Sequence, residues 1–237
     1  MQAPFPGTRT DRLSVLVIVP CLNEGPVLRQ TLVELLSLNL GVVVVDDGSS
    51  PPMRDFCRGL PVHLLRHSVN LGQGAALQTG MDYALGQGAD YLIHFDADGQ
   101  HDPAAIPRAL EILRRGDTAV VLGSRFLNAE HTRAVPWLKR CILRGGIAVS
   151  WVFSGLWLTD THNGFRGFTR AAAQQIHLTE NGFSHATEIL EQIQRAGLRY
   201  RELPTLVRYT DYSQRKGQSV ANSVNLIVDL LLHKILR

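Results

Sequence analysis

Hydrophobic and polar positions alternate in blocks over the first half of the chain. Short apolar runs rich in β-branched residues predict buried strands at residues 14–20, 41–50, 61–66, 90–95 and 118–124. Apolar residues at helical spacing predict intervening helices over residues 24–38, 73–88 and 103–116. Strands that are apolar almost throughout and alternate with helices are typical of a parallel sheet covered on both faces. The pattern therefore predicts a doubly wound α/β fold.

The regular alternation stops near Arg125. We expect residues 1–12 to be a flexible tail without a signal peptide. Residues 13–237 would form one domain with three parts: a first half (13–124), a second half (125–218) and a C-terminal segment (219–237). The last part carries apolar residues on one helical stripe and predicts an amphipathic C-terminal helix. Such a helix needs a partner, and the sequence leaves the choice open between the protein's own core, a dimer mate, a separate membrane protein and a lipid surface.

Composition narrows the classes of function. A chain of 237 residues with 45% hydrophobic residues can bury a full core. The formal net charge of +3 is too small for a nucleic-acid footprint, so we expect no nucleic-acid partner. The three cysteines show no CxxC spacing, which argues against a disulfide framework or a zinc site and favours the cytoplasm. The longest uncharged stretch, 145–159, is shorter than the roughly 20 residues that cross a bilayer.

Polar side chains gather where three of the predicted strands end. The stretches are "VPCLNEG" with Asn23 and Glu24, "VVDDGSS" with Asp46 and Asp47, and "YLIHFDADGQHDP" with Asp96, Asp98 and Gln100. Each alone could be a helix cap or a tight turn. In open α/β sheets, however, ligands bind beyond the carboxyl ends of the strands, and carboxylates gathered there repel each other unless a cation holds them.

The third cluster has the character of a site for a hard cation. Asp96 and Asp98 are two residues apart, so strand geometry would aim both carboxylates the same way, and Gln100 can add a neutral oxygen. Such oxygen ligands suit Mg²⁺ or Mn²⁺ with phosphates completing the shell. The loop lacks the ligand spacing of an EF-hand, and no P-loop or dinucleotide fingerprint is present. His101 is expected to orient this loop, and His94 to be a satisfied core histidine.

Five motifs resemble glycosyltransferase family 2, whose members have the nucleotide-sugar-binding GT-A fold: "VIVPCLNE", "VVDDGSS", "NLGQGAALQTGM", "HFDADGQHDP" and "GSRF". The resemblance covers about residues 14 to 220. The "DADGQH" form, "GSR" and "DTHNGFRGFTR" are similar to the branch that transfers mannose or glucose to polyprenyl (dolichyl) phosphate. The resemblance implies that the donor is bound by Pro20, Asn23, Glu24, Asp47, Gly72, Gly74, Asp96 and Arg215, and the metal by Asp96, Asp98 and Gln100. In this branch a lysine often follows the serine of the loop "SQRKGQS", but here Val220 follows Ser219. Arg215 or Lys216 would then have to supply the positive charge.

Basic residues cluster after the fifth predicted strand. The cluster comprises Arg125, Arg133, Lys139, Arg140 and Arg144. It is either a solvated face or a site for an anionic head group, because arginine pairs bidentately with phosphate. Trp151 and Trp157 follow among aliphatic residues, where they would contact lipid at a membrane surface or pack in the core. Arg125, Arg140, Arg144 and Arg166 are our acceptor-binding candidates.

Asp98, Arg125 and Asp160 are our catalytic candidates. Asp160 begins the "DTHNGFR" stretch and could instead be a helix cap. A sugar hydroxyl needs a general base, whereas a phosphate monoester is already largely anionic at neutral pH. With a phosphate acceptor no general base is needed, and Asp160 would instead help to position the site or to order its loop.

The sequence thus predicts a peripheral enzyme on the cytoplasmic face of a membrane. It would transfer a hexose, with inversion and with Mg²⁺ or Mn²⁺, from a donor such as GDP-mannose or UDP-glucose to a polyprenyl phosphate. One alternative is a family 2 enzyme that acts on a glycan hydroxyl. Another is a non-catalytic nucleotide-sugar-binding partner of a membrane complex.

Overall fold

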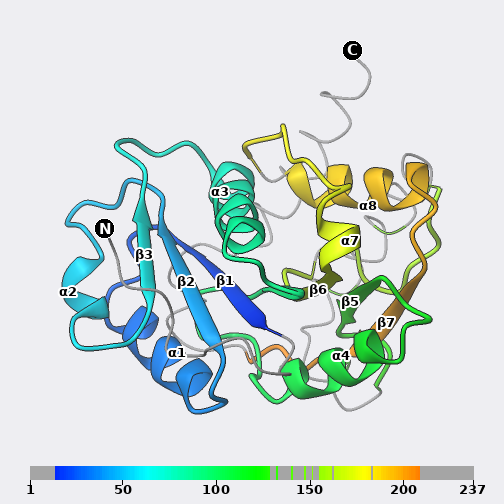
Figure 1. Ribbon diagram of the computed structural model, residues 1–237, viewed down its shortest axis with the longest axis horizontal. Helices are drawn as coiled ribbons and strands as arrows, with labels where there is room; N and C mark the ends of the chain where they lie inside the picture. The colour runs from blue at the N-terminus through cyan, green and yellow to red at the C-terminus, as the bar shows by residue number, and fades with distance from the viewer. Residues whose placement is uncertain are drawn as a thin grey trace.

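The computed structural model describes residues 14–128, 132, 140, 147, 151, 155–161, 163–182 and 184–208. Its centre is a seven-stranded sheet in the order β3-β2-β1-β4-β6-β5-β7 (Figure 1). The strands are β1 (Val15–Cys21), β2 (Gly41–Asp46), β3 (His63–Arg66), β4 (Tyr91–His94), β5 (Val120–Ser124), β6 (Arg166–Thr169) and β7 (Tyr200–Pro204). The helices are α1 (Pro26–Leu36), α2 (Arg54–Cys57), α3 (Gln73–Gly86), α4 (Ala105–Arg114), α7 (Arg170–Ala173) and α8 (His185–Arg195).

Most of the sheet is parallel. β1 pairs in parallel with β2 and β4, β2 with β3, and β5 with β7. β6 is antiparallel to both of its neighbours, β4 and β5. The predicted α/β fold with a mostly parallel sheet is therefore confirmed. The predicted tail and C-terminal helix lie outside the described residues.

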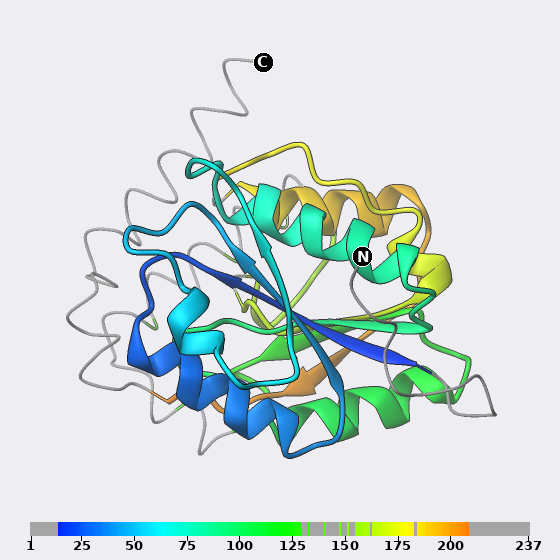
Figure 2. The same cartoon turned by 60° about the vertical axis from the view of Figure 1, so that its left-hand side comes forward.

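Helices cover both faces of the sheet, with α1 and α4 on one side and α3 and α8 on the other (Figure 2). Alternate side chains of β1 supply the two cores. Val17 and Val19 pack in the cluster that contains residues of α1 and α4, whereas Leu16 and Ile18 pack with residues of α3 and α8. Because β1 is buried on both faces, it shows no alternation of polar and apolar residues, and its apolar run is continuous.

The eight elements predicted before Arg125 are all present, with ends that shift by a few residues. The sequence pattern missed β6 and β7. β6 has four residues, and β7 is an edge strand that carries Arg201 and Glu202, so neither shows a long apolar run. The part of the chain after Arg125 nevertheless supplies both strands to the same sheet, and β6 lies inside it.

Gly80 brings α3 close to β1. A Cβ at Gly80 would lie 2.3 Å from Cγ2 of Ile18, a fully buried β-branched residue that has no room to move. We predict that Gly80→Ala lowers the free energy of unfolding by roughly 1–3 kcal/mol through overpacking. Gly86→Ala, at the end of the same helix with nothing within 4 Å of its Cβ, should be neutral or stabilising by about 1 kcal/mol. Urea unfolding of the two variants checks the difference, and equal destabilisation would contradict it.

Candidate active site

The three polar clusters meet at the carboxyl edge of the sheet. The backbone N–H of Asp47 donates to the carbonyl of Cys21 (2.9 Å), and that of Asn23 donates to Oγ of Ser49 (2.9 Å). These bonds join the turn after β1 to the turn after β2. Oγ1 of Thr31 in α1 donates to the carbonyl of Ala97 (3.3 Å), which ties α1 to the loop after β4. The expectation that these turns lie together is confirmed.

Asp46 anchors the turn after β2. It is fully buried and accepts hydrogen bonds from the backbone of Ser49 (2.9 Å) and Met53 (3.1 Å), and it pairs with Nη1 of Arg66 (2.5 Å). Burial alone would raise the pKa of this carboxyl, but the hydrogen bonds and the charge of Arg66 lower it. Asp46 therefore has a structural role in a tight turn, which explains its presence without a ligand. Arg66 ends β3 in register with Asp46, a partner that a correct strand alignment could have indicated.

Asp47 holds the loop that precedes α3. Its carboxylate accepts bonds from the backbone of Leu71 (2.9 Å) and Gly72 (2.8 Å), and it pairs with Nδ1 of His67 (2.7 Å). Its role toward a nucleoside stays a prediction. In this structure it fixes the loop that would border one.

Gly72 and Gly74 are required by the chain itself. A Cβ at Gly72 would lie 2.2 Å from the carbonyl oxygen of Asn181, and one at Gly74 would lie 2.0 Å from that of Glu180. The backbone N–H of Gly74 also donates to the carbonyl of Asn181 (2.9 Å). The close approach at these two glycines is made by residues 180–181, so it does not by itself indicate a ligand.

Asp96 and Asp98 lie in the loop after β4, not in the strand. β4 ends at His94, so the strand periodicity that we used to align the two carboxylates does not apply. They are nevertheless close in sequence within one loop, and burial together with the negative charge of Asp96 raises the pKa of Asp98 to about 6. The Asp98 carboxylate accepts one bond, from the backbone of Gln100 (3.0 Å).

Asp96 is held on both of its oxygens. Oδ2 pairs with Nε2 of His101 (2.9 Å), and Oδ1 accepts a bond from Nε2 of Gln73 (3.2 Å) in the first turn of α3. Burial opposes both charges, but the pair raises the pKa of His101 and lowers that of Asp96. Sequence reasoning missed Gln73, because nothing in a helix start indicates contact with a loop 23 residues later.

The loop after β4 fits a divalent cation in its chemistry. The raised pKa of Asp98 reports a repulsion between carboxylates that a cation would relieve. Gln100 is buried in the same loop, and its amide oxygen is a chemically suitable ligand for such a cation. The described residues contain no group of three or more His, Cys, Asp or Glu side chains placed for a metal, so water and diphosphate would have to complete the shell.

Arg125 and Asp160 form a buried bidentate ion pair on the other side of the site. Nε of Arg125 lies 2.6 Å from Oδ2 of Asp160, and Nη2 lies 2.7 Å from Oδ1. The backbone N–H of Arg125 also donates to Oδ2 (3.1 Å). Nδ2 of Asn163, a residue that sequence reasoning missed, donates to the same oxygen (3.5 Å). We expected the Arg125 guanidinium to face an acceptor, but its Nε and Nη2 donate to Asp160 instead.

The other acceptor candidates are placed unevenly. Arg140 is half-buried and donates to the carbonyl of Thr132 (2.8 Å). Arg166 is 3% exposed and donates to the carbonyl of Ala186 (3.3 Å), which favours an internal role over direct acceptor contact. Arg144 and Arg215 lie outside the described residues. Pro20 is a buried residue of β1, and Glu24 is buried beside it in the following turn.

His94 differs from its expectation. It is buried, as expected, but neither ring nitrogen has a hydrogen-bond partner among the described residues, so it is not a satisfied core histidine. Its ring packs on Phe168, with centroids 4.9 Å apart. Burial and the charge of Arg166 lower the pKa of His94 to about 3, so the ring stays neutral at physiological pH.

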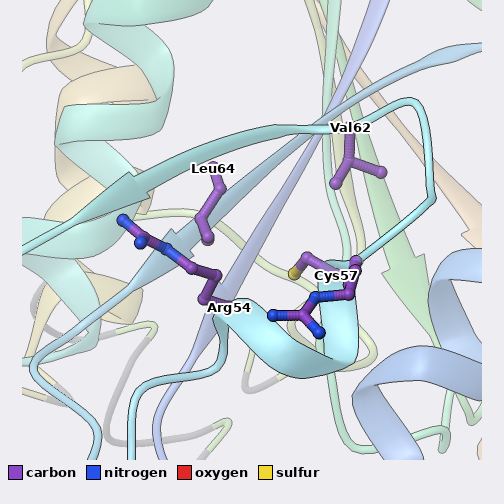
Figure 3. A pocket seen from close by; sticks show the side chains of 5 residues that line it. Arg54, Cys57, Val62 and Leu64 are labelled. Atoms are coloured by element: carbon purple, nitrogen blue, oxygen red, sulfur yellow. The ribbon is translucent and has the colours of Figure 1, made fainter.

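A pocket of about 300 Å³ lies away from this edge, between α2 and the start of β3 (Figure 3). It is lined by Arg54, Cys57, Arg58, Val62 and Leu64. Burial and the charge of Asp46 raise the pKa of the Cys57 thiol to about 11, so the thiol stays protonated. The lining contains no carboxylate or hydroxyl, and we therefore place the chemistry at the carboxyl edge of the sheet.

Comparison with known proteins identifies the class. Residues 16–177 match the family described as glycosyl transferase family 2, and the chain belongs to this family. The chain is a glycosyltransferase, and its fold is the GT-A fold of the family. Glucosyl-3-phosphoglycerate synthase from Mycobacterium tuberculosis, in a complex with Mn²⁺, UDP and glucosyl-3-phosphoglycerate, superimposes with a TM-score of 0.66 at 14% identity. That likeness covers 93% of this chain and 79% of the other, and it shows the fold.

Two curated relatives match almost the whole chain. The undecaprenyl-phosphate mannosyltransferase of Micrococcus luteus is 31% identical, over 89% of this chain and 92% of its own length. The UDP-N-acetylglucosamine–dolichyl-phosphate N-acetylglucosaminyltransferase of Methanococcus voltae is 26% identical, over 95% of this chain and 97% of its own length. The relatives therefore act on polyprenyl phosphates, although their names give different sugars.

The buried pair predicts a large cost for Asp160→Asn. The change leaves the buried Arg125 charge without its counter-ion, so the free energy of unfolding should fall by roughly 3–5 kcal/mol. Asp117→Asn is the matched control, because Asp117 pairs with Arg201 at a similar distance (2.7 Å) but at the surface. It should cost less than about 1 kcal/mol. Guanidinium unfolding of both variants measures the difference. Similar losses of unfolding free energy would show that the buried Arg125–Asp160 pair contributes no more to stability than a surface pair.

Proposed function

We propose that the chain transfers a hexose from a nucleotide sugar to a polyprenyl phosphate at a membrane surface, with inversion at the anomeric carbon. The observation that carries the proposal is the electrostatic state of the loop after β4. Asp96 and Asp98 share one loop at the edge where the fold family binds nucleotide sugars, and burial with the negative charge of Asp96 raises the pKa of Asp98. A divalent cation would supply the positive charge that this loop lacks, and it would in turn bind the diphosphate of the donor. The names of the relatives in turn support a polyprenyl phosphate as acceptor.

Mg²⁺ or Mn²⁺ would be held by Asp96, Asp98 and Gln100. When bound, it neutralises the charge of the leaving nucleoside diphosphate. The chain's own residues provide the positions: Gln73 and His101 fix the Asp96 carboxylate from two sides, and the bond from the backbone of Gln100 fixes Asp98. The Mn²⁺ in the M. tuberculosis complex supports a divalent cation in this fold. Pro20, Asn23, Glu24 and Asp47 are the proposed nucleoside contacts.

The contacts of Asp160 favour phosphate over a hydroxyl as the acceptor. A general base must reach the proton of the nucleophile. Both oxygens of Asp160 accept bonds from Arg125, and one of them also from Asn163, so the carboxylate is engaged as a counter-ion. A phosphate monoester needs no base, because it is already anionic near neutral pH. The alternative of a glycan hydroxyl as acceptor would require Asp160 to leave this pair.

The deciding experiment uses a panel of labelled nucleotide sugars, including GDP-mannose, UDP-glucose and UDP-N-acetylglucosamine. Each is incubated with the protein, Mn²⁺ and either a polyprenyl phosphate or the corresponding polyprenol. We expect label in the lipid phase only with the phosphate. Transfer to a hydroxyl acceptor in place of the phosphate would support the glycan alternative. Donor binding without transfer or hydrolysis under any condition would support a non-catalytic partner.

Asp98→Ala tests the cation site. We predict a fall in kcat/KM of at least about 100-fold, because the proposed cation would lose one of the two carboxylates that we assign to it. Asp102→Asn is the control, since it removes a charge four residues later that pairs with Arg208 at the surface. It should keep nearly full activity. Wild-type transfer that survives chelation, or an active Asp98→Ala, would refute the cation assignment.

Trp151 and Trp157 form the proposed contact with the membrane. Their side chains are 45% and 68% exposed, and their rings pack edge to face with centroids 5.3 Å apart. Core packing, the competing expectation, does not describe these two residues. Paired exposed indoles are favoured at the boundary between lipid and water. Among the described residues no helix is long and apolar enough to cross a membrane.

We predict that Trp157→Ala weakens binding to vesicles of anionic phospholipid by about 5-fold or more in flotation, because it removes one interfacial anchor. Val33→Ser, which removes an exposed apolar side chain from α1, is the control and should bind normally. Wild-type protein that fails to float at both low and high salt would favour a protein partner or a dimer mate for this surface.

A further inference from the structure

The segment from Asp160 to Arg166 passes between the two halves of the proposed site. At one end, Asp160 pairs with Arg125. At the other, Arg166 begins β6 and stands in register with His94, the last residue of β4. The segment thus connects the ion pair to the strand that carries the loop with Asp96 and Asp98.

Gly164, inside this segment, lies against the Asp96 carboxylate. A Cβ on Gly164 would lie 2.1 Å from Oδ2 and 2.7 Å from Cγ of Asp96. Gly164 does not have a positive φ, so the backbone conformation does not explain the glycine. The close approach of the Asp96 carboxylate explains it, because a larger residue would collide with this group. The glycine therefore forms a third wall around a carboxylate whose oxygens are already held by Gln73 and His101.

Asn163 fixes the segment on the other side. Its Nδ2 donates to Oγ1 of Thr205 (3.0 Å) and to Oδ2 of Asp160 (3.5 Å). Its Oδ1 accepts the backbone N–H of Phe165 (3.0 Å). All the atoms involved are buried, so Gly164 is held between two fixed neighbours and cannot retreat easily from an added methyl group.

Arg166 adds a charge that acts on both halves. Burial lowers its pKa to about 10, against the charges of Asp96 and Asp160, which raise it, so the side chain remains charged at neutral pH. The neighbouring rings of His94 and His185 carry no charge there, because burial and Arg166 lower their pKa values to about 3 and about 4. Its side chain is buried and donates to the carbonyl of Ala186 (3.3 Å), and its register with His94 places this cation at the end of the strand that leads to Asp96.

We infer that residues 163–166 form a positioning bridge, in which Gly164 and Arg166 set the place of the Asp96 carboxylate relative to the Arg125–Asp160 ion pair. This inference rests on the proposed function, which places the donor phosphates at one end of the bridge and the acceptor phosphate at the other. Gly164 and Arg166 are positioning residues: they act through Asp96 and need not touch substrate.

Gly164→Ala tests the steric half of the bridge without the acceptor. Calorimetric titration measures binding of Mn²⁺ with GDP or with UDP, whichever the wild type binds more tightly. We expect Gly164→Ala to bind about 10-fold more weakly or worse, because the methyl group displaces Asp96. Gly182→Ala is the control, since Gly182 also lacks a positive φ and nothing lies within 4 Å of its Cβ. Normal binding by Gly164→Ala would overturn the inference.

A double-mutant cycle identifies the contact by a readout independent of any ligand. Gly164→Ala should lower the urea midpoint in the wild type and in Asp96→Asn, whose side chain has the same shape. It should have little effect in Asp96→Ala, where the colliding group is absent. If Gly164→Ala alone does not fold, the variant combined with Asp96→Ala should. Equal effects in both Asp96 backgrounds, or failure of the combined variant to fold, would overturn the inference.

Arg166→Met and Arg166→Lys test the electrostatic half. Loss of the charge in Arg166→Met should weaken nucleotide binding and raise KM for the acceptor, and Arg166→Lys should restore part of both. Equal loss in the two variants would show that the charge is not what matters. A wild type that binds Mn²⁺ and nucleotide but does not transfer to polyprenyl phosphate would refute the proposed acceptor and leave the binding and stability tests of the bridge in force.

Discussion

The structure depends on how it balances negative charge at one edge of the sheet. Parallel pairing of β1, β2 and β4 brings the turns after all three strands to the same edge, and each turn carries carboxylates. Each buried carboxylate needs a counter-charge or several hydrogen-bond donors, because burial removes the water that would otherwise stabilise it. The partners found for these groups decide which of them are structural and which are left for a ligand.

Four carboxylates have a basic partner within the protein. Asp46 has Arg66, Asp47 has His67, Asp96 has His101, and Asp160 has Arg125, each with further hydrogen bonds. Asp98 is the exception: it accepts one backbone bond, and burial and its neighbour raise its pKa to about 6. The cation that we propose at this loop would compensate Asp98, which accepts a single backbone hydrogen bond among the described residues.

The antiparallel strand β6 joins the two halves of the chain. It lies between β4 and β5, so residues some 40 positions after Arg125 return to the centre of the sheet. That return places Gly164 against Asp96 and Asp160 on Arg125. In the proposed function, the sheet would therefore set the distance between the donor and acceptor phosphates.

The sequence by itself determined the α/β class, eight of the nine elements before Arg125 and the three acidic turns, because strand and helix periods and turn residues are local signals. The family followed from the motifs those turns carry. Only the tertiary structure decided the partners: that Arg66 neutralises Asp46, that Gln73 reaches Asp96, that residues 180–181 require the glycines before α3, and that Arg125 pairs with Asp160. These contacts join residues 20 to more than 100 positions apart, and their geometry depends on strand order. β6 (RGFT) and β7 (YRELP) contain too few apolar residues to be recognised as strands, so that order could not be predicted.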